Sequence, residues 1–286
     1  MQPQARERRL PRRDRVEVLV RPAHLDVGDL SGRRVAVGRL GAGLEVGQRP
    51  RIDRHLDLAD LAHPAGAVED DAFSGLRVGL TKFRDTAAEF FDQTLKFTLR
   101  NQATEEFITA TPFEHLDVLP SSPRLEELHS KLESRYKIYK LRDALDALGT
   151  RYDRIYIDTP PALNFYTRSA LMGASGCLIP FDCDEFSRKA LYTLMENVEE
   201  IRADHNADLV VEGIVVNQFQ PRANLPRRLV QELIDDGLPV LEPYLPSSVR
   251  IRESHELSLP MIYLDPNHRL TQALVELHDA LEAGRA

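Results

Sequence analysis

A carboxylate at the end of an apolar segment is the most informative feature of the chain. Residues 154–157 predict a short strand, and Asp158 follows it, directly before Thr159 and two prolines. Ligands of open parallel sheets bind beyond the carboxyl ends of the strands. An Asp there can hold Mg²⁺ through water, because this ion keeps several of its own waters. The alternative is that Asp158 caps a helix that begins near Ala162, and the spacing alone leaves both interpretations open.

The elements that must position this carboxylate alternate between helical and strand patterns. Candidate helices span residues 83–99, 123–148, 162–174, 187–201, 225–236 and 270–281. Candidate strands span residues 116–119, 154–157, 176–180, 209–217 and 240–245. Continuous apolar runs such as Cys177 to Ile179 suit strands that are buried on both faces. The pattern therefore predicts an α/β fold, with a doubly wound, mostly parallel sheet flanked by helices.

Several ordered motifs in the same region resemble the ParA/MinD/Soj family of ATPases. In that family one strand ends in Asp-Thr-Pro-Pro, a later strand ends in Asn, and a loop reads Ile-Pro-x-x-Val-Arg-x-x-Glu. The matching segments of this chain are residues 152–161, 181–184, 215–219, 245–254 and 259–266. The five segments lie between residues 152 and 266, and the resemblance, taken over about residues 80–286, implies a P-loop NTPase-like fold.

The resemblance also implies a function and assigns roles to residues. A family member binds Mg²⁺ and ATP, dimerises around the nucleotide, binds DNA without sequence preference and hydrolyses ATP when a ParB-like partner stimulates it. Asp158 would bind Mg²⁺ through water or help to position the attacking water, as the catalytic residue. Asn217 would read the adenine ring. The other residues near adenine would be Pro246, Ser247, Val249 and Arg250.

The phosphate-binding half of such a site has no counterpart in the sequence. The family has a loop Lys-Gly-Gly-x-Gly-Lys-Thr/Ser after its first strand, whose N–H groups and lysines hold the phosphates. No lysine precedes Lys82, and no Gly-Lys-Ser/Thr occurs anywhere. The glycine cluster from Gly38 to Gly47 is interpreted as a turn-rich loop. The family motif Asp-x-Asp-Pro-Gln is also absent. We therefore expect impaired hydrolysis, because the loop supplies most of the charge stabilisation of the transferred phosphate.

Residues 1–79 differ in composition from residues 80–286. The first segment has 14 Arg but no Lys, Asn, Thr, Tyr or Cys. It can bury little surface. We predict an atypical segment over residues 1–79, either a divergent or disordered extension or a translation out of frame, and a ParA-like ATPase domain that lacks its P-loop over residues 80–286. Without a native first strand, the parallel sheet would lack its central member and expose unpaired edges.

The out-of-frame hypothesis has a specific form. Read backwards on the complementary strand, residues 71 to 61 can encode Val-Val-Phe-Asn-x-x-Gly-Gly-Val-Gly-Lys, which resembles the first strand and loop of the family. The nucleotide sequence tests it. The hypothesis requires the codons GTT at Val68, GAA at Glu69 and CTT at Leu61, and any other codon there rejects it.

Four arginines in the second region, residues 80–286, supply candidate DNA contacts. Arg222, Arg227 and Arg228 lie around the start of a candidate helix, and Arg252 lies in a later loop. By resemblance they would neutralise DNA phosphates without reading bases. The alternative is a solvated helix face.

Composition excludes several other classes. The net charge of −8 argues against a polybasic nucleic-acid binder, and no apolar run approaches the ~20 residues that span a bilayer. The last helix carries acidic residues on its outer face, which argues against a membrane anchor. Cys177 and Cys183 are expected to be free thiols in a reducing cytoplasm, and the resemblance adds association with the bacterial nucleoid.

Two rival functions remain open. The first is a non-catalytic module that binds DNA or a partner protein but no ATP, and tight Mg²⁺-dependent ATP binding would exclude it. The second is another P-loop relative, such as the cobyrinic-acid or dethiobiotin synthetases. Residues 158–161 and 248–253 fit the ParA pattern better.

Overall fold

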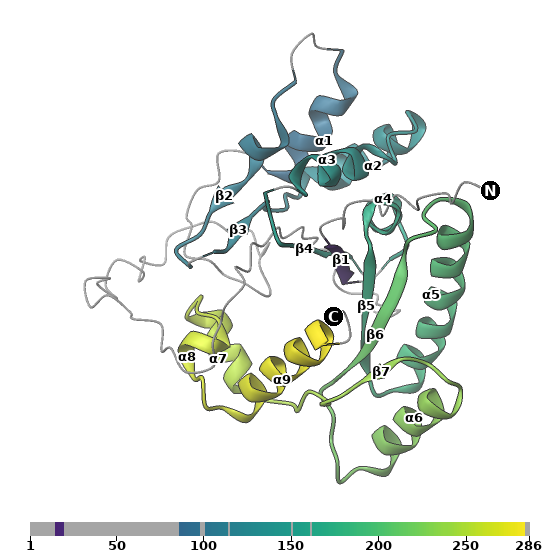
Figure 1. Cartoon of the computed structure of the whole chain (residues 1–286), viewed down its shortest axis with the longest axis vertical. Helices are drawn as coiled ribbons and strands as arrows, with labels where there is room; N and C mark the ends of the chain where they lie inside the picture. The colour runs from purple at the N-terminus through teal and green to yellow at the C-terminus, as the bar shows by residue number, and fades with distance from the viewer. Residues whose placement is uncertain are drawn as a thin grey trace, which may run out of the picture.

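The structure is a computed structural model that describes residues 15–19, 86–97, 101–113, 115–149, 151–160 and 162–283. Within those residues the main sheet has five strands, all parallel, in the order β4-β1-β5-β6-β7 (Figure 1). The strands are β1 (Arg15–Leu19), β4 (Arg154–Asp158), β5 (Gly176–Asp182), β6 (Val210–Asn217) and β7 (Val240–Leu241). A separate antiparallel pair joins β2 (Thr109–Ala110) to β3 (Asp117–Val118). The predicted doubly wound parallel sheet is confirmed.

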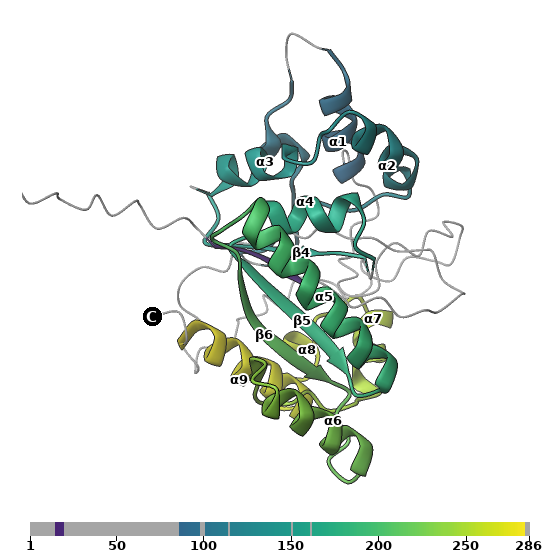
Figure 2. The same cartoon turned by 90° about the vertical axis from the view of Figure 1, so that its right-hand side faces the viewer.

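Helices cover both faces of this sheet (Figures 1 and 2). They are α1 (Ala87–Leu95), the short 3₁₀ helix η2 (Thr104–Phe107), α2 (Arg124–Ser134), α3 (Lys140–Leu148), α4 (Phe165–Gly173), α5 (Glu185–Asp204), α6 (Asn224–Asp235), α7 (Arg250–Glu256), α8 (Met261–Leu264) and α9 (Arg269–Ala283). In the described part of the chain, none of them combines the length and the hydropathy that crossing a bilayer requires.

Strand β1 occupies an interior position of the sheet, which corrects an expectation from the sequence. We expected the sheet to lack its central strand, yet residues 15–19 pair in parallel with β4 on one side and β5 on the other. The short run Arg-Val-Glu-Val-Leu supplies it, because a strand paired on both sides needs only extended backbone and its N–H and C=O groups. The Gly38–Gly47 cluster and residues 61–71 lie outside the described residues.

Alternation along the strands sends side chains to two different cores. Cys177 and Ile179 of β5 belong to the larger buried cluster, to which α4 and α5 contribute. Leu178 points to the other face and shares a second cluster with Val215 of β6 and Leu270 of α9. Because both faces of β5 are covered, its sequence is continuously apolar, as expected for a buried parallel strand.

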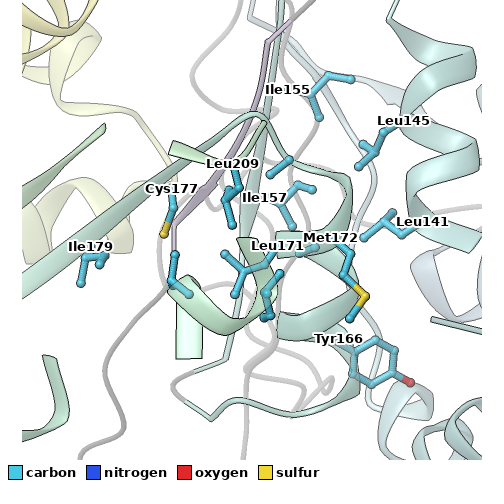
Figure 3. Packing of buried hydrophobic residues seen from close by; sticks show 14 of the residues in the cluster. Leu141, Leu145, Ile155, Ile157, Tyr166, Leu171, Met172, Cys177, Ile179 and Leu209 are labelled. Atoms are coloured by element: carbon cyan, nitrogen blue, oxygen red, sulfur yellow. The ribbon is translucent and has the colours of Figure 1, made fainter. Parts of the chain in front are cut away.

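The larger core continues under the edge strand β4. Ile155 and Ile157 of β4 gather with Leu141 and Leu145 of α3 and with Leu171 of α4 (Figure 3). Each of these side chains is at most 5% exposed. Full burial of such a side chain is worth roughly 1.5–3 kcal/mol, so this layer holds β4, and with it Asp158, in place.

The helix predicted over residues 123–148 is wrong as a single element, because it breaks between α2 and α3. Tyr136 adopts a left-handed conformation with φ 53°, and the N–H of Lys137 donates to the carbonyl of Leu132, a bond typical of a helix end. The positions of the apolar residues around the helix axis are consistent with this break. Leu132 and Leu141 are nine positions apart, which at about 100° per residue puts them on opposite sides of one continuous helix.

Candidate functional site

Asp158 is the last residue of β4, at the carboxyl edge of the sheet where the sequence placed it. Its Oδ1 atom is buried. Arg154, on the same face of this strand, forms a salt bridge to Glu282 of α9 at 2.5 Å between Nη2 and Oε2, which ties β4 to the last helix. The edge strand and its terminal carboxylate are therefore held from both faces of the sheet.

The alternative role of Asp158 as a helix cap is wrong. Helix α4 begins at Phe165, not near Ala162, and its N-cap is Asn164. The Asn164 side chain accepts from the N–H groups of Tyr166 at 3.0 Å and Thr167 at 3.2 Å. The start of α4 is capped by Asn164, so Asp158 remains a candidate ligand for Mg²⁺.

Asn164→Ala is expected to lower the free energy of unfolding by about 1 kcal/mol, the usual cost of losing an N-cap acceptor. The measurement is the midpoint of urea unfolding followed by circular dichroism. Asn164→Asp is the matched control, because its carboxylate can accept the same two N–H groups and should keep the wild-type midpoint. Equal losses in both variants would show that the cap does not contribute this energy.

Asn217 ends β6 and lies beside the candidate adenine loop. The N–H of Leu245 donates to the carbonyl of Val216 at 2.9 Å, and the N–H of Phe219 donates to the carbonyl of Leu245 at 2.9 Å. Phe219 also forms a parallel bridge with Pro246. Backbone hydrogen bonds on both sides of Asn217 thus hold the start of the loop. The structure brings together the end of β6 and the loop from Leu245, which the sequence had proposed as separate parts of an adenine site.

The rest of the loop is fastened to the turn before α9. The Ser248 hydroxyl lies 3.4 Å from Nε2 of His268, and Nε of Arg250 lies 3.6 Å from a carboxylate oxygen of Asp265. Arg250 also pairs with Glu253 on α7. Arg250 is therefore engaged within the protein, whereas Val249, beside it, is 70% exposed. Sequence reasoning missed the partners of Arg250, because no spacing links residues 250 and 265.

An aromatic pair lies where the chain after β6 meets the start of the candidate adenine loop. The rings of Phe219 and Tyr244 meet edge to face with centroids 4.8 Å apart, and both side chains pack against the larger core.

Cys183 packs against the same larger core. Burial raises the pKa of the Cys183 thiol to about 11, and the carboxylates of Asp182 and Asp184 contribute. The predicted free thiols Cys177 and Cys183 are both unpaired with any other cysteine.

Asp158 and Asn217 lie on strands three positions apart in the sheet order. At about 4.8 Å between neighbouring strands this is roughly 14 Å, a span comparable to an extended nucleoside triphosphate. The single carboxylate of Asp158 suits Mg²⁺, which takes few protein ligands and retains water. A phosphate-binding loop would follow β1 between them, and the residues after Leu19 contain no Gly-Lys-Ser/Thr. The adenine and metal ends fit the cofactor, whereas the phosphate end lacks the usual donors.

The candidate DNA-contacting arginines occupy two places. Arg222 precedes α6, Arg227 and Arg228 lie near its start, and Arg252 lies on α7, which stands apart from α6 in Figures 1 and 2. All four are exposed. Arg228 forms salt bridges with Glu185 at 3.0 Å and Glu232 at 3.5 Å. In the described ranges no acidic side chain pairs with Arg222, Arg227 or Arg252, so their charges face solvent.

Comparison with known proteins gives the family. A family model described as an AAA domain matches residues 74–211. The chromosome partitioning protein ParA of Myxococcus xanthus is 32% identical over 169 residues, which cover 58% of this chain and 60% of that protein. The sporulation initiation inhibitor protein Soj of Bacillus subtilis is 30% identical over 176 residues, which cover 60% of this chain and 69% of that protein. The chain belongs to the ParA/Soj family of partitioning ATPases. The resemblance drawn from the sequence motifs is confirmed.

Solved structures share the fold of this ParA/Soj family chain. The septum site-determining protein MinD of Pyrococcus horikoshii, solved with Mg-ADP, is 20% identical with a TM-score of 0.55 and covers 70% of this chain and 74% of its own. The cobyrinic acid a,c-diamide synthase of Mycobacterium smegmatis, solved with an ATP analogue and magnesium, is 22% identical with a TM-score of 0.58 and covers 70% and 72%. At these identities the likeness is one of fold. The P-loop NTPase-like prediction is confirmed, and the sequence relatives are ParA and Soj proteins.

Proposed function

We propose that this chain is a ParA-type partitioning protein that binds ATP with Mg²⁺ at the carboxyl edge of its sheet and hydrolyses it poorly. The observation that supports ATP binding is the contact between the end of β6 and the loop from Leu245, in which the residues on either side of Asn217 bond to Leu245. Ser247, Val249 and Arg250 would complete the adenine side. The site belongs to residues 80–286, and residues 1–79 contribute the central strand.

In this proposal Asp158 acts at the far end of the nucleotide. Its carboxylate would hold Mg²⁺ through water or orient the attacking water. The metal would supply charge neutralisation for the phosphates. Because the chain lacks the lysines and the hydroxyl of the usual loop, little charge stabilisation remains for the transferred phosphate. Slow hydrolysis is the consequence.

Asp158→Asn is expected to weaken Mg²⁺-dependent ATP binding about tenfold, because a neutral amide loses the charge that attracts the hydrated ion. The measurement is equilibrium binding of a fluorescent ATP analogue to the full chain, with Mg²⁺ and with EDTA. Asp153→Asn is the matched control, since this residue precedes the same strand at its other end. It should leave the binding unchanged.

Two outcomes would count against the proposal. Equal binding with and without Mg²⁺ in the wild type would remove the metal role of Asp158. No binding by a folded, monodisperse sample would favour the alternative, a degenerate ATPase that serves as a non-catalytic DNA- or partner-binding module.

The remaining parts of the proposal come from the family. We infer a homodimer, nonspecific DNA contacts through Arg222, Arg227 and Arg252 with a smaller share for Arg228, and a ParB-like stimulating partner. The setting would be the bacterial cytoplasm, at the nucleoid. The exposed charges of Arg222 and Arg227, without acidic partners in the described residues, are what favours the DNA contact.

A further inference from the structure

Two polar side chains end neighbouring strands at the proposed adenine site. Asp182 is the last residue of β5, Asn217 is the last residue of β6, and the two are register partners. Nδ2 of Asn217 donates to Oδ1 of Asp182 at 3.0 Å. Both side chains are half-buried. The proposed function gives a role to Asn217 only, so the role of Asp182 is open.

A carboxylate partner determines which way the amide faces. An ionised carboxylate only accepts hydrogen bonds, whereas an Asn amide has a donor end and an acceptor end of nearly equal shape. Only the NH₂ group of Asn217 can therefore face Asp182. The amide oxygen is on the opposite side of the amide group, directed away from Asp182, and it makes no hydrogen bond within the described residues. An amide without such a partner could turn over.

The backbone around both residues limits how this pair can move. The turn after Asp182 is closed by the N–H of Asp184, which donates to the Asp182 carbonyl at 2.8 Å. Asp184 itself caps α5, accepting from the N–H of Phe186 at 2.9 Å. After Asn217 the chain turns through Gln218, which has φ 51°, into the bond between Phe219 and Leu245. The amide orientation is therefore built into a rigid frame.

We propose that Asp182 is a positioning residue that makes the site select adenine over guanine. This rests on the proposed adenine role of Asn217. At the same place on the purine ring, adenine carries an NH₂ donor and guanine carries an oxygen acceptor. With its NH₂ held by Asp182, Asn217 offers an oxygen to the base. That oxygen can accept a hydrogen bond from the NH₂ group of adenine, whereas it would repel the oxygen that guanine carries at the same position.

The expected selectivity is moderate, because it depends on one hydrogen bond. A well-placed base contact discriminates by roughly tenfold to a hundredfold. Asp182→Asn keeps the size of the side chain but removes the one-way acceptor, since a carboxamide can pair with either end of Asn217. The amide of Asn217 can then turn its NH₂ toward the base, and guanine becomes acceptable.

The test uses uncharged nucleosides, so that the loss of a negative charge near the phosphates has no influence. Adenosine and guanosine are titrated into the ¹⁵N-labelled full chain, and dissociation constants are obtained from chemical shifts. We expect the wild type to bind adenosine at least about tenfold more tightly than guanosine. In Asp182→Asn the ratio of the two dissociation constants should be close to one, mainly because guanosine binds more tightly. Asp182→Ser repeats the test if Asp182→Asn fails to fold.

The matched control is Asp235→Asn. Asp235 accepts from the Gln231 amide at 2.8 Å on α6, which is the same kind of pair at an exposed position. It should keep the wild-type ratio. An unchanged ratio in Asp182→Asn overturns the inference, and so does a wild type that binds neither nucleoside. Selective adenosine binding without Mg²⁺-dependent ATP binding would support the inference and contradict only the phosphate end of the proposed function.

Discussion

Proline at position 18 is expected to abolish the stable fold of this chain. Residues 17–19 of β1 are in register with both β4 and β5, so the backbone of Val18 lies between two partner strands. Proline has no N–H to donate and is excluded from central strands. We expect Val18→Pro to lower the free energy of unfolding by about 3 kcal/mol, the upper end of the usual cost of leaving a backbone group inside the sheet without its hydrogen-bond partner, which is a large part of the stability of an ordinary domain.

Urea unfolding, followed by circular dichroism and by size-exclusion chromatography, measures this effect. Val18→Thr is the control, because threonine keeps the N–H and the β-branched shape that strands favour. A Val18→Pro chain with the wild-type midpoint would show that residues 15–19 do not form the central strand. The out-of-frame interpretation of the N-terminal segment would then gain support, and the codons at positions 61, 68 and 69 would decide it.

Reversing two charges near the start of α6 is expected to reduce the affinity for DNA by about 10- to 100-fold, because contacts to the phosphates are lost. Each lost contact also lowers the steepness of log K against log salt by about 0.9. The variant is Arg222→Glu with Arg227→Glu. Both side chains are exposed and lack acidic partners in the described residues. The salt slope should therefore fall by about 2. Fluorescence anisotropy with unrelated duplexes at several salt concentrations measures both quantities.

Arg202→Glu is the control for this variant. Arg202 is also exposed and lies near the end of α5, where it pairs with Glu199 at 2.8 Å. It should leave the salt slope at the wild-type value. If the α6 double variant and Arg202→Glu weaken binding equally, the effect comes from net charge and not from a contact surface. Arg228→Glu should act mainly on stability, because Arg228 bridges Glu185 and Glu232.

Local patterns predicted most of the secondary structure, because buried parallel strands and amphipathic helices have distinctive periods. The strand predicted over 209–217 is observed as Val210–Asn217, and the helix over 225–236 as Asn224–Asp235. The ends of elements were less predictable. Residues 83–99 shorten to Ala87–Leu95 within the described residues, and residues 240–245 form a strand only at Val240–Leu241. Helix α7 occupies part of a segment that the motif suggested to be a loop.

Two features were not predictable from spacing. The cap of α4 comes from Asn164 rather than from Asp158, because β4 ends at Asp158 and the helix begins only at Phe165. Residues 15–19 alternate charged and apolar side chains, which is typical of a strand with one solvated face and does not predict a strand paired on both sides in a parallel sheet. Their place depends on the gap between β4 and β5, which an extended backbone segment can fill by hydrogen bonding to both strands.

The sequence by itself determined the family, most of the order of strands and helices after residue 80, and the residue types at the strand ends, because these depend on local periodicity and on short motifs. Only the tertiary structure decided which strand ends meet. Parallel pairing aligned Asp182 with Asn217, and the loop from Leu245 closed on Phe219. These contacts join residues about 30 positions apart in the chain. Their register follows from packing on both faces of the sheet, which no local pattern encodes.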